Sequence, residues 1–426
     1  QAQGHQPLAI ESHPRIVRLT GASAKRQAFA ATRGGRQIGR LTEALLATLE
    51  EAGDTWPTLS WATVGHRVRE HVIGALQMEG QWVNLAGPRA RRLFRTETVT
   101  EPGAVAFIPA DDPGRGWIRA GWLQGAATGD RWAVSSGGVD TEVVVESVGR
   151  NRSEVVVEGA ATGMPMGSAA HPVRLAARMP VDVPSALQPM VEDSAWLCAG
   201  SGDIAERVVA RDGGWVVEPS ARWIGAQMSD DPEGRAAAVE LLEQRARWWT
   251  VARCLSEHEP DPCPVRWSWS RGADGTALPN EGAELGAGDR VVVDLWFDGT
   301  VPLSWFISVV FIDPIGESTL LSASMPEGIE LRAGELERLG VRRGSRARGV
   351  ALPWPKAATA SEGRAQLLLL ASRRPLSLDH LVRAGALDDA AIALPGLVHD
   401  TVRGHRPEHA RACAWTTFEF SLAASS

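Results

Sequence analysis

Two groups of cysteine and histidine residues lie close enough in the sequence to share a metal ion. They are His405, His409 and Cys413, and Cys254, His258 and Cys263. Zinc takes such side chains in tetrahedral sites, but neither group has the paired Cys-x-x-Cys spacing of a structural zinc site. In the first group, Pro407 also opposes the helix that would align the three side chains. We therefore expect ordinary core or surface residues at both places, and no metal or cofactor.

The common hydrolase and nucleotide-binding motifs are missing from the sequence. It contains no Gly-x-Ser-x-Gly and no His-Glu-x-x-His motif. Its two lysines, Lys25 and Lys356, do not follow a glycine, which excludes a phosphate-binding P-loop. A net charge of −7 leaves no basic stripe for nucleic acid. By motif alone, the chain shows no complete catalytic apparatus.

Two polar clusters allow both a functional and a structural interpretation. His66 and His71 lie five residues apart on one predicted helix, so they point to different faces. We expect solvated helix positions here rather than a joint ligand or a proton relay. The arginines between Arg89 and Arg95 could form an anion-binding patch, but such a run more often lies in a solvated segment, which is our expectation.

The first 97 residues predict an α/β region. Residues 15–20 are typical of a short buried strand, and a solvated loop is expected over 31–40. A helix should follow over about 42–53, with its leucines on one face. The next helix, over about 61–74, carries valines spaced by four residues, and a strand is expected around 82–85. This alternation of strand and helix is an α/β signature.

The rest of the chain is expected to be mostly β. Residues 98–185 show the short strands and turns of a small, mainly antiparallel β module. Residues 186–284 mix strands with one long helix opening at Asp231-Pro232, and end in a linker or long surface loop over 272–284. Residues 285–426 predict a sandwich-like β-rich domain. The predicted fold class is thus an α/β region followed by mostly β domains, α+β overall.

Cysteine usage and hydropathy bear on the compartment. Four cysteines in 426 residues do not make a disulfide scaffold, and no secretory signal is visible. No run of about 18 apolar residues is present, so no membrane span is expected. These features favour a cytoplasmic location. The first residue is Gln rather than Met, and we expect a processed or truncated chain that once had residues upstream.

Short motifs follow one another in order between residues 14 and 95. They are the strand 15–23, the pair Gln27-Ala28, a Gly-x-x-Thr helix opening at 39–42, the helix 61–72, a partial Gln-x-Pro-x-x-x-Gly match at 77–80, and Arg-x-Leu-Phe at 91–94. In this order they resemble the small-subunit half of bacterial caspase-like cysteine peptidases. The resemblance covers about a fifth of the chain. Segments 120–125 and 288–291 also resemble the long extensions of some of these proteins.

The resemblance implies a cysteine endopeptidase that cleaves protein substrates. In this family the catalytic His and Cys lie on a preceding large-subunit half, so no catalytic residue is assigned to this chain. The His makes the Cys a thiolate, which attacks the peptide carbonyl. The implied partner is the chain's own large-subunit fragment, and the implied role is bacterial antiviral or stress-triggered proteolysis, with autoprocessing.

The same resemblance indicates where a substrate would bind. The segment 20–27 would form one wall of the groove, in which an extended peptide pairs with an exposed strand edge. Its candidate substrate-binding residues are Ala22, Ser23 and Gln27; alternatively, this segment is a plain loop that closes the strand. The family often has an acidic residue just after the Gln-Ala pair, whereas this sequence has the apolar run 29–31. A preference for basic substrate residues is therefore not implied.

A second hypothesis belongs to a different class. The chain could be a non-catalytic β-rich protein-interaction module with a vestigial caspase-like scaffold. All but Trp56, Trp61 and Trp82 of the 17 tryptophans lie after residue 98. Such residues are mostly buried in cores, although an aromatic binding surface is the other possibility.

Overall fold

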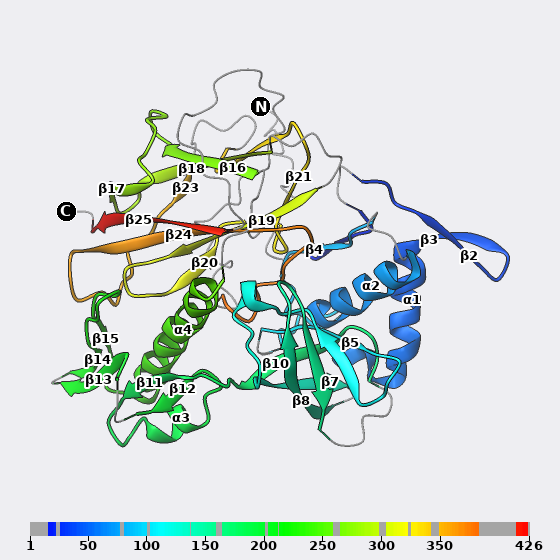
Figure 1. Cartoon of the computed structure of the whole chain (residues 1–426), viewed down its shortest axis with the longest axis horizontal. Helices are drawn as coiled ribbons and strands as arrows, with labels where there is room; N and C mark the ends of the chain where they lie inside the picture. Colours follow the sequence, from blue (N-terminus) through cyan, green and yellow to red (C-terminus); the bar gives the residue numbers. More distant parts are fainter. Residues whose placement is uncertain are drawn as a thin grey trace, which may run out of the picture.

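The computed structural model describes most of the chain. The described residues are 16–22, 26–76, 81–99, 103–136, 138–158, 164–200, 203–211, 213–258, 265–297, 304–322, 325–341, 349–382 and 415–424. They form a mixed α+β structure in which strands predominate (Figure 1).

A two-stranded antiparallel sheet and two helices make up the first region. Strand β1 (Arg18–Thr20) pairs with β4 (Asn84–Ala86), and Leu19 lies opposite Leu85. Helix α1 (Arg40–Ala52), the short 3-10 helix η2 (Gly53–Thr58) and helix α2 (Trp61–Leu76) lie between them in the chain. The predicted valine stripe of α2 is confirmed, because all three valines are buried in one core with residues of α1 and of the β4 segment.

Two expectations for this region are wrong. The predicted loop over 31–40 is a hairpin of β2 (Ala30–Arg33) and β3 (Arg36–Gly39). Gly34 and Gly35 form its turn with φ of 56° and 77°, as a tight two-residue hairpin turn requires. The predicted leucine face of α1 is wrong for one of its residues: Leu45 and Leu49 pack, half-buried, against the core, whereas Leu46 is 42% exposed and the fully buried positions are small ones. α2 packs closely against α1, which favours small side chains on the facing surface.

A closed six-stranded barrel follows. Its strands, in barrel order, are β10 (Ser168–Arg174), β5 (Val105–Pro109), β6 (Arg115–Ile118), β9 (Ser153–Val157), β8 (Val139–Val148) and β7 (Arg131–Ser136). All its pairings are antiparallel, as predicted for this part of the chain. Closure leaves the barrel no open strand edge. The 3-10 helix η3 (Trp122–Gln124) lies between β6 and β7 in the chain.

A five-stranded mixed sheet and one long helix form the next layer. The sheet order is β12 (Leu197–Ala199), β11 (Met179–Asp182), β13 (Glu206–Arg211), β14 (Gly214–Val217) and β15 (Ala226–Met228), with the short helix α3 (Gln188–Glu192) between β11 and β12 in the chain. Helix α4 (Pro232–Ser256) begins at the predicted place, because the Asp231 carboxylate caps it by accepting from the Gly234 N–H at 2.6 Å. Figure 1 shows α4 between this sheet and the C-terminal strands.

The C-terminal part is a β-sandwich. One sheet contains β16 (Val265–Arg271), β18 (Arg290–Phe297) and β22 (Leu336–Leu339), with β23 (Val350–Ala351) also on β18. The other has the order β17 (Glu281–Gly286), β25 (Trp415–Ala423), β24 (Glu362–Ser372), β19 (Trp305–Ile312) and β20 (Ser318–Leu320), with β21 (Ile329–Leu331) also on β19.

Strands β19 and β24 separate two cores; β19 is apolar apart from Ser308, and β24 has an apolar run over 367–371. In β24, Leu367 and Leu369 point into the sandwich, whereas Leu368 and Leu370 join the core around α4. Because successive side chains of a strand point to opposite faces, a strand covered on both faces needs an unbroken apolar run. The segment 272–284 is not a linker between regions, since β16 before it pairs with β18 after it and β17 begins within it.

Candidate functional site

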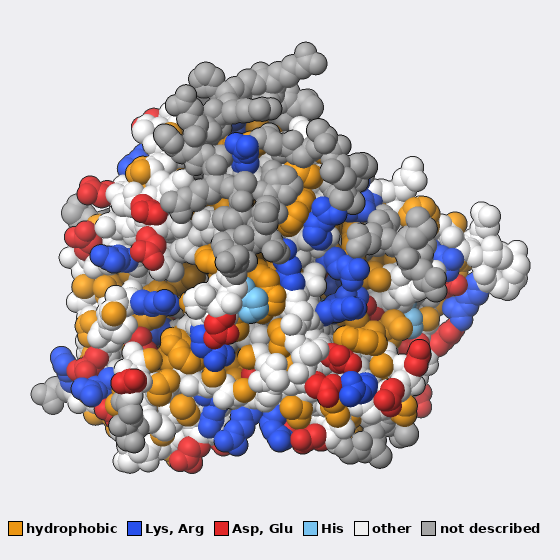
Figure 2. Space-filling model, in the orientation of Figure 1, with side chains coloured by type: hydrophobic (Ala, Val, Ile, Leu, Met, Phe, Trp, Pro, Cys, Tyr) orange, Lys and Arg blue, Asp and Glu red, His pale blue; other side chains and the backbone are white. Residues whose placement is uncertain are grey.

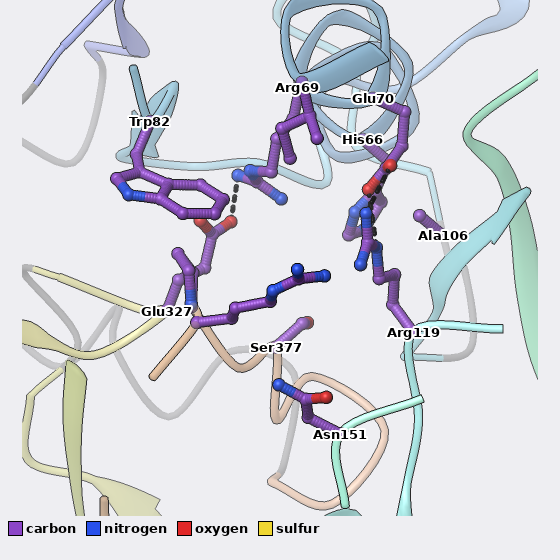
Figure 3. Close-up of a pocket in the computed structure, with 12 residues that line it drawn as sticks. His66, Arg69, Glu70, Trp82, Ala106, Arg119, Asn151, Glu327 and Ser377 are labelled. Carbon is purple, nitrogen blue, oxygen red and sulfur yellow. Dashed lines mark hydrogen bonds and ion pairs between the residues drawn. The ribbon is translucent and has the colours of Figure 1, made fainter. Parts of the chain in front are cut away.

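Helix α2 has a second buried face, opposite the valine stripe, and this face is polar. His66, Arg69, Glu70 and Ile73 follow the i, i+3, i+4, i+7 spacing of one helix face. They line a cavity of about 230 Å³ together with residues from four other parts of the chain (Figure 3). Those residues are Trp82, Ala106, Arg119, Asn151, Glu327, Arg374, Pro375 and Ser377. The first region, the barrel and the sandwich therefore meet at this cavity.

Two arginines enter the cavity from different elements and are held by carboxylates. Arg119, just after β6, donates from Nε and Nη2 to the two oxygens of Glu70 at 2.9 and 2.8 Å. Arg69 forms an ion pair with Glu327, and its Nε and Nη2 lie 3.3 Å from the Val83 carbonyl oxygen. Figure 3 shows Arg69 and Arg119 approaching from opposite sides. Paired bonds of this kind fix the plane of a guanidinium.

A third buried ion pair lies beside the cavity. Arg89 donates to both oxygens of Asp379, at 2.9 and 2.6 Å. Burial alone would raise the pKa of Asp379, but the charge and hydrogen bonds of Arg89 hold it below its usual value. The pair joins the loop after β4 to the segment 373–382 after β24. Figure 2 shows several basic side chains on the surface over this part of the molecule.

The prediction of a solvated segment over 89–95 is therefore wrong for Arg89. Only 18% of its side chain is exposed, against 51% for Arg95. The acid that neutralises Arg89 comes from 290 residues further along the chain, which no local pattern reveals.

His66 is buried rather than solvated, which corrects the sequence-based expectation. It is 5% exposed, and no hydrogen-bond partner of its ring lies among the described residues. Burial, together with the nearby Arg69 charge, lowers the pKa of His66 to about 4. The imidazole is thus neutral at pH 7, with one N–H donor and one acceptor nitrogen. His71 lies on another face, as predicted, and its Nε2 is 3.2 Å from a Glu51 oxygen.

Because the pKa of His66 is lowered in the folded protein, we expect folding stability to fall at acid pH. Replacing His66 should remove this part of the fall. In the unfolded chain this histidine binds a proton below about pH 6.5, whereas in the folded chain it stays neutral down to about pH 4. Folding stability therefore falls as the pH drops through this window. Between pH 7.5 and pH 5 we expect the free energy of unfolding to fall by about 2 kcal/mol more in the wild type than in His66→Gln. Urea unfolding at each pH measures this difference. Equal losses in the two proteins would contradict a neutral, buried His66.

The residues proposed to bind substrate lie elsewhere. Ala22 is half-buried just after β1, and Gln27 is exposed. Ser23 lies outside the described residues. Arg26, beside Gln27, donates from Nε to Glu330 at 2.7 Å and so fixes this segment against the sandwich. Neither Ala22 nor Gln27 lines the cavity, so the cavity and the proposed substrate segment are separate features.

The cysteine and histidine groups do not form a metal centre in the described part of the chain, where no cluster of three or more candidate ligands occurs. Cys254 is buried, and burial raises the pKa of its thiol to about 11. His258 stacks on Trp122 with ring centroids 4.3 Å apart. The other residues of the two groups, Cys263, His405, His409 and Cys413, lie outside the described residues.

Sequence reasoning missed most of the charged residues at the cavity. One signal for this site was present in the sequence. His66, Arg69 and Glu70 share one helix face opposite the valines, so the helix has a separate polar face that could line a site. No such signal existed for Arg119 or Glu327, which reach the site only through the tertiary fold.

None of the helices in the described ranges has both the length and the apolar character that crossing a bilayer requires. Comparison of the sequence with protein-family models gave no match, and neither the curated proteins nor the solved structures gave one.

Proposed function

We propose that this chain is the small-subunit part, with a long extension, of a caspase-like cysteine endopeptidase. The catalytic His and Cys would lie on a separate large-subunit polypeptide. The observation that carries the proposal is the topology of the first region: two antiparallel strands, β1 and β4, connected through helices α1 and α2. Of the ordered motifs, the strand motif overlaps β1, the Gly-x-x-Thr motif spans the start of α1 and the helix 61–72 lies within α2, whereas the partial match at 77–80 lies outside the described residues.

We infer that a further strand completes the sheet of the first region. Within the described residues, β1 pairs only with β4. An isolated two-stranded sheet is marginally stable, and an unpaired edge is a template for another strand. All five described positions from Ile16 to Thr20 are half-buried, where a central strand would be fully buried. A large-subunit strand that pairs with β1 would complete the sheet and bring the reactive sulfur next to the segment 20–27.

The proposed mechanism divides the work between two polypeptides. The large subunit supplies the thiolate that attacks the peptide carbonyl and the histidine that activates it. This chain supplies the sheet that positions them and one wall of the groove, through Ala22, Ser23 and Gln27. We place the enzyme in the cytoplasm, where a catalytic thiol stays reduced, and propose a role in antiviral or stress-triggered proteolysis by analogy with the family it resembles.

The companion polypeptide is the direct test. The chain is purified under native conditions from its own source and its partners are identified by mass spectrometry. We expect a tightly bound polypeptide carrying a Cys and a His, and a peptidase activity against arginyl, lysyl or aspartyl reporter peptides that iodoacetamide abolishes. A Cys198→Ala variant should keep both the activity and its sensitivity to alkylation, because that half-buried thiol belongs to this chain and not to the proposed dyad. Absence of a companion together with absence of activity would refute the proposal.

Gln27 offers a test within this chain. Gln27→Ala should lower kcat/KM for peptide substrates by about tenfold, mainly through KM, because the lost side chain would bind substrate rather than reacting atoms. Gln37→Ala, an exposed glutamine in the nearby hairpin, is the matched control and should leave both constants within twofold. If the two variants behave alike, the segment 20–27 is a plain loop.

The tryptophans bear on the non-catalytic alternative. Ten of the 14 tryptophans after residue 98 are buried and four, Trp117, Trp249, Trp354 and Trp415, are half-buried. Most of them are buried in the barrel, around α4 and in the sandwich, including Trp132, Trp215 and Trp267.

A further inference from the structure

We propose that the cavity beneath α2 binds a small oxyanion, the carboxylate or phosphate group of a small metabolite. This inference does not depend on the peptidase proposal. It starts from His66, whose side chain is 5% exposed and lines the cavity. Its ring nitrogens do not belong to the fully enclosed atoms that lack a partner, so they face the space of the cavity. A buried polar group needs a hydrogen-bond partner, and here that partner comes from what the cavity holds, water or a ligand. A ligand in the cavity supplies the missing hydrogen bond.

The two carboxylate-held arginines supply further donors. Arg119 uses Nε and Nη2 on Glu70, and Arg69 uses Nε and Nη2 on the Val83 carbonyl and Glu327. In neither residue does Nη1 have a hydrogen-bond partner within the described part of the chain. The carboxylates therefore neutralise and orient the guanidiniums while leaving one terminal nitrogen of each for a ligand. Fixed guanidinium nitrogens match the geometry of carboxylate and phosphate oxygens.

The other charged group at the wall is compatible with this assignment. Arg374 also lines the cavity, and the lining acids, Glu70 and Glu327, are both engaged by arginines. The Asn151 amide donates from Nδ2 to the Ser372 hydroxyl at 3.5 Å and has a second hydrogen to offer from the barrel side. Figure 3 shows it beside Ser377. A neutral His66 can donate to an oxyanion without requiring protonation. Donors thus outnumber the acceptors that remain open, which favours an anion over a cation.

The size of the cavity limits the ligand. The cavity has a volume of about 230 Å³. It lies below the usual range of drug-sized pockets, about 300–1,000 Å³. The ligand is therefore a small acid or phosphate compound rather than a nucleotide or a peptide. Because it would contact α2 and the barrel at once, it would also hold these two parts together.

Calorimetric titration of the full chain at constant ionic strength tests the proposal, with inorganic phosphate and succinate as probes and succinamide as the uncharged control. We expect saturable binding of one equivalent of at least one anion and no binding of succinamide. The tighter of the two anions identifies the oxyanion class. If neither anion gives saturable heat up to about 10 mM, the cavity holds only water and the proposal is wrong.

Substitutions at two histidines of α2 localise the binding. His66→Phe removes the ring nitrogens and fills space without orphaning a protein partner, so it should weaken binding at least tenfold, while His66→Gln, which keeps a donor, should stay within about threefold. His71→Phe makes the same change on the other face of the helix and should leave affinity within twofold. Thermal unfolding without ligand checks that each variant folds. Wild-type affinity in His66→Phe would place the anion elsewhere and overturn the proposal; if that variant does not fold, unchanged affinity of Arg119→Lys would overturn it equally.

Discussion

Replacing Arg245 by Met is expected to lower the free energy of unfolding by about 5 kcal/mol. Arg245, in the middle of α4, is completely buried, and it forms an ion pair with the buried Glu206 of β13. It also donates from Nε to the Ile315 carbonyl at 2.7 Å and from Nη2 to the Ile224 carbonyl at 2.8 Å. Methionine would leave a buried carboxylate without its counter-charge and two carbonyl oxygens without donors. Removing one partner of a buried ion pair costs about 3–5 kcal/mol, and the two unpaired carbonyls add to this cost.

The double variant Arg245→Met with Glu206→Leu shows whether this loss comes from the stranded charge. Removing both ions should recover at least half of the lost stability, because well-packed apolar residues often replace a buried pair at little cost. Urea unfolding followed by tryptophan fluorescence measures each variant. A loss below about 1 kcal/mol in the single variant would show that water reaches Glu206, contrary to the burial described here.

Asp379→Asn is expected to lower the free energy of unfolding by about 3 kcal/mol and to make the segment 373–382 open more readily. The amide cannot balance the Arg89 charge, which then stays largely buried without a carboxylate. Because the wild-type pKa of Asp379 is depressed, its contribution is present at neutral pH and disappears as the pH falls below about 3.8 through the folded-state pKa. The difference between the two proteins should therefore shrink towards acid pH. Urea unfolding at several pH values gives this difference, and hydrogen exchange over 373–382 reports the loosening.

An exposed ion pair in the same protein is the matched control. Arg207 and Asp182 are about half-exposed, at 52% and 47%, and their oxygen and nitrogen are 2.9 Å apart. Asp182→Asn should change stability by less than about 1 kcal/mol, because solvent screens the charges. If Asp182→Asn and Asp379→Asn cost the same, the Arg89 pair does not hold the two parts of the chain together.

Local sequence patterns predicted several of the main elements of this protein. The valine spacing of α2, the Asp231 cap of α4 and the apolar runs of β19 and β24 each predicted the element that the structure contains. These patterns work because a helix or strand must turn a regular set of apolar side chains towards a core, whatever that core is. The hairpin at 30–39 was missed because its arginines outweighed the Gly34-Gly35 turn signal.

Only the tertiary structure decided the polar site. Glu70 and Arg119 are 49 residues apart, and Arg89 and Asp379 are 290 apart, yet each pair makes two hydrogen bonds. A charged side chain has the same local pattern whether it faces solvent or a partner from another part of the chain. His66 shows this most clearly: its helix and its face follow from the sequence, but its burial depends on the barrel and on the segment 373–382 that close over it. Spacing along the chain therefore determined most of the elements, and packing between distant segments determined which charges are buried and which are paired.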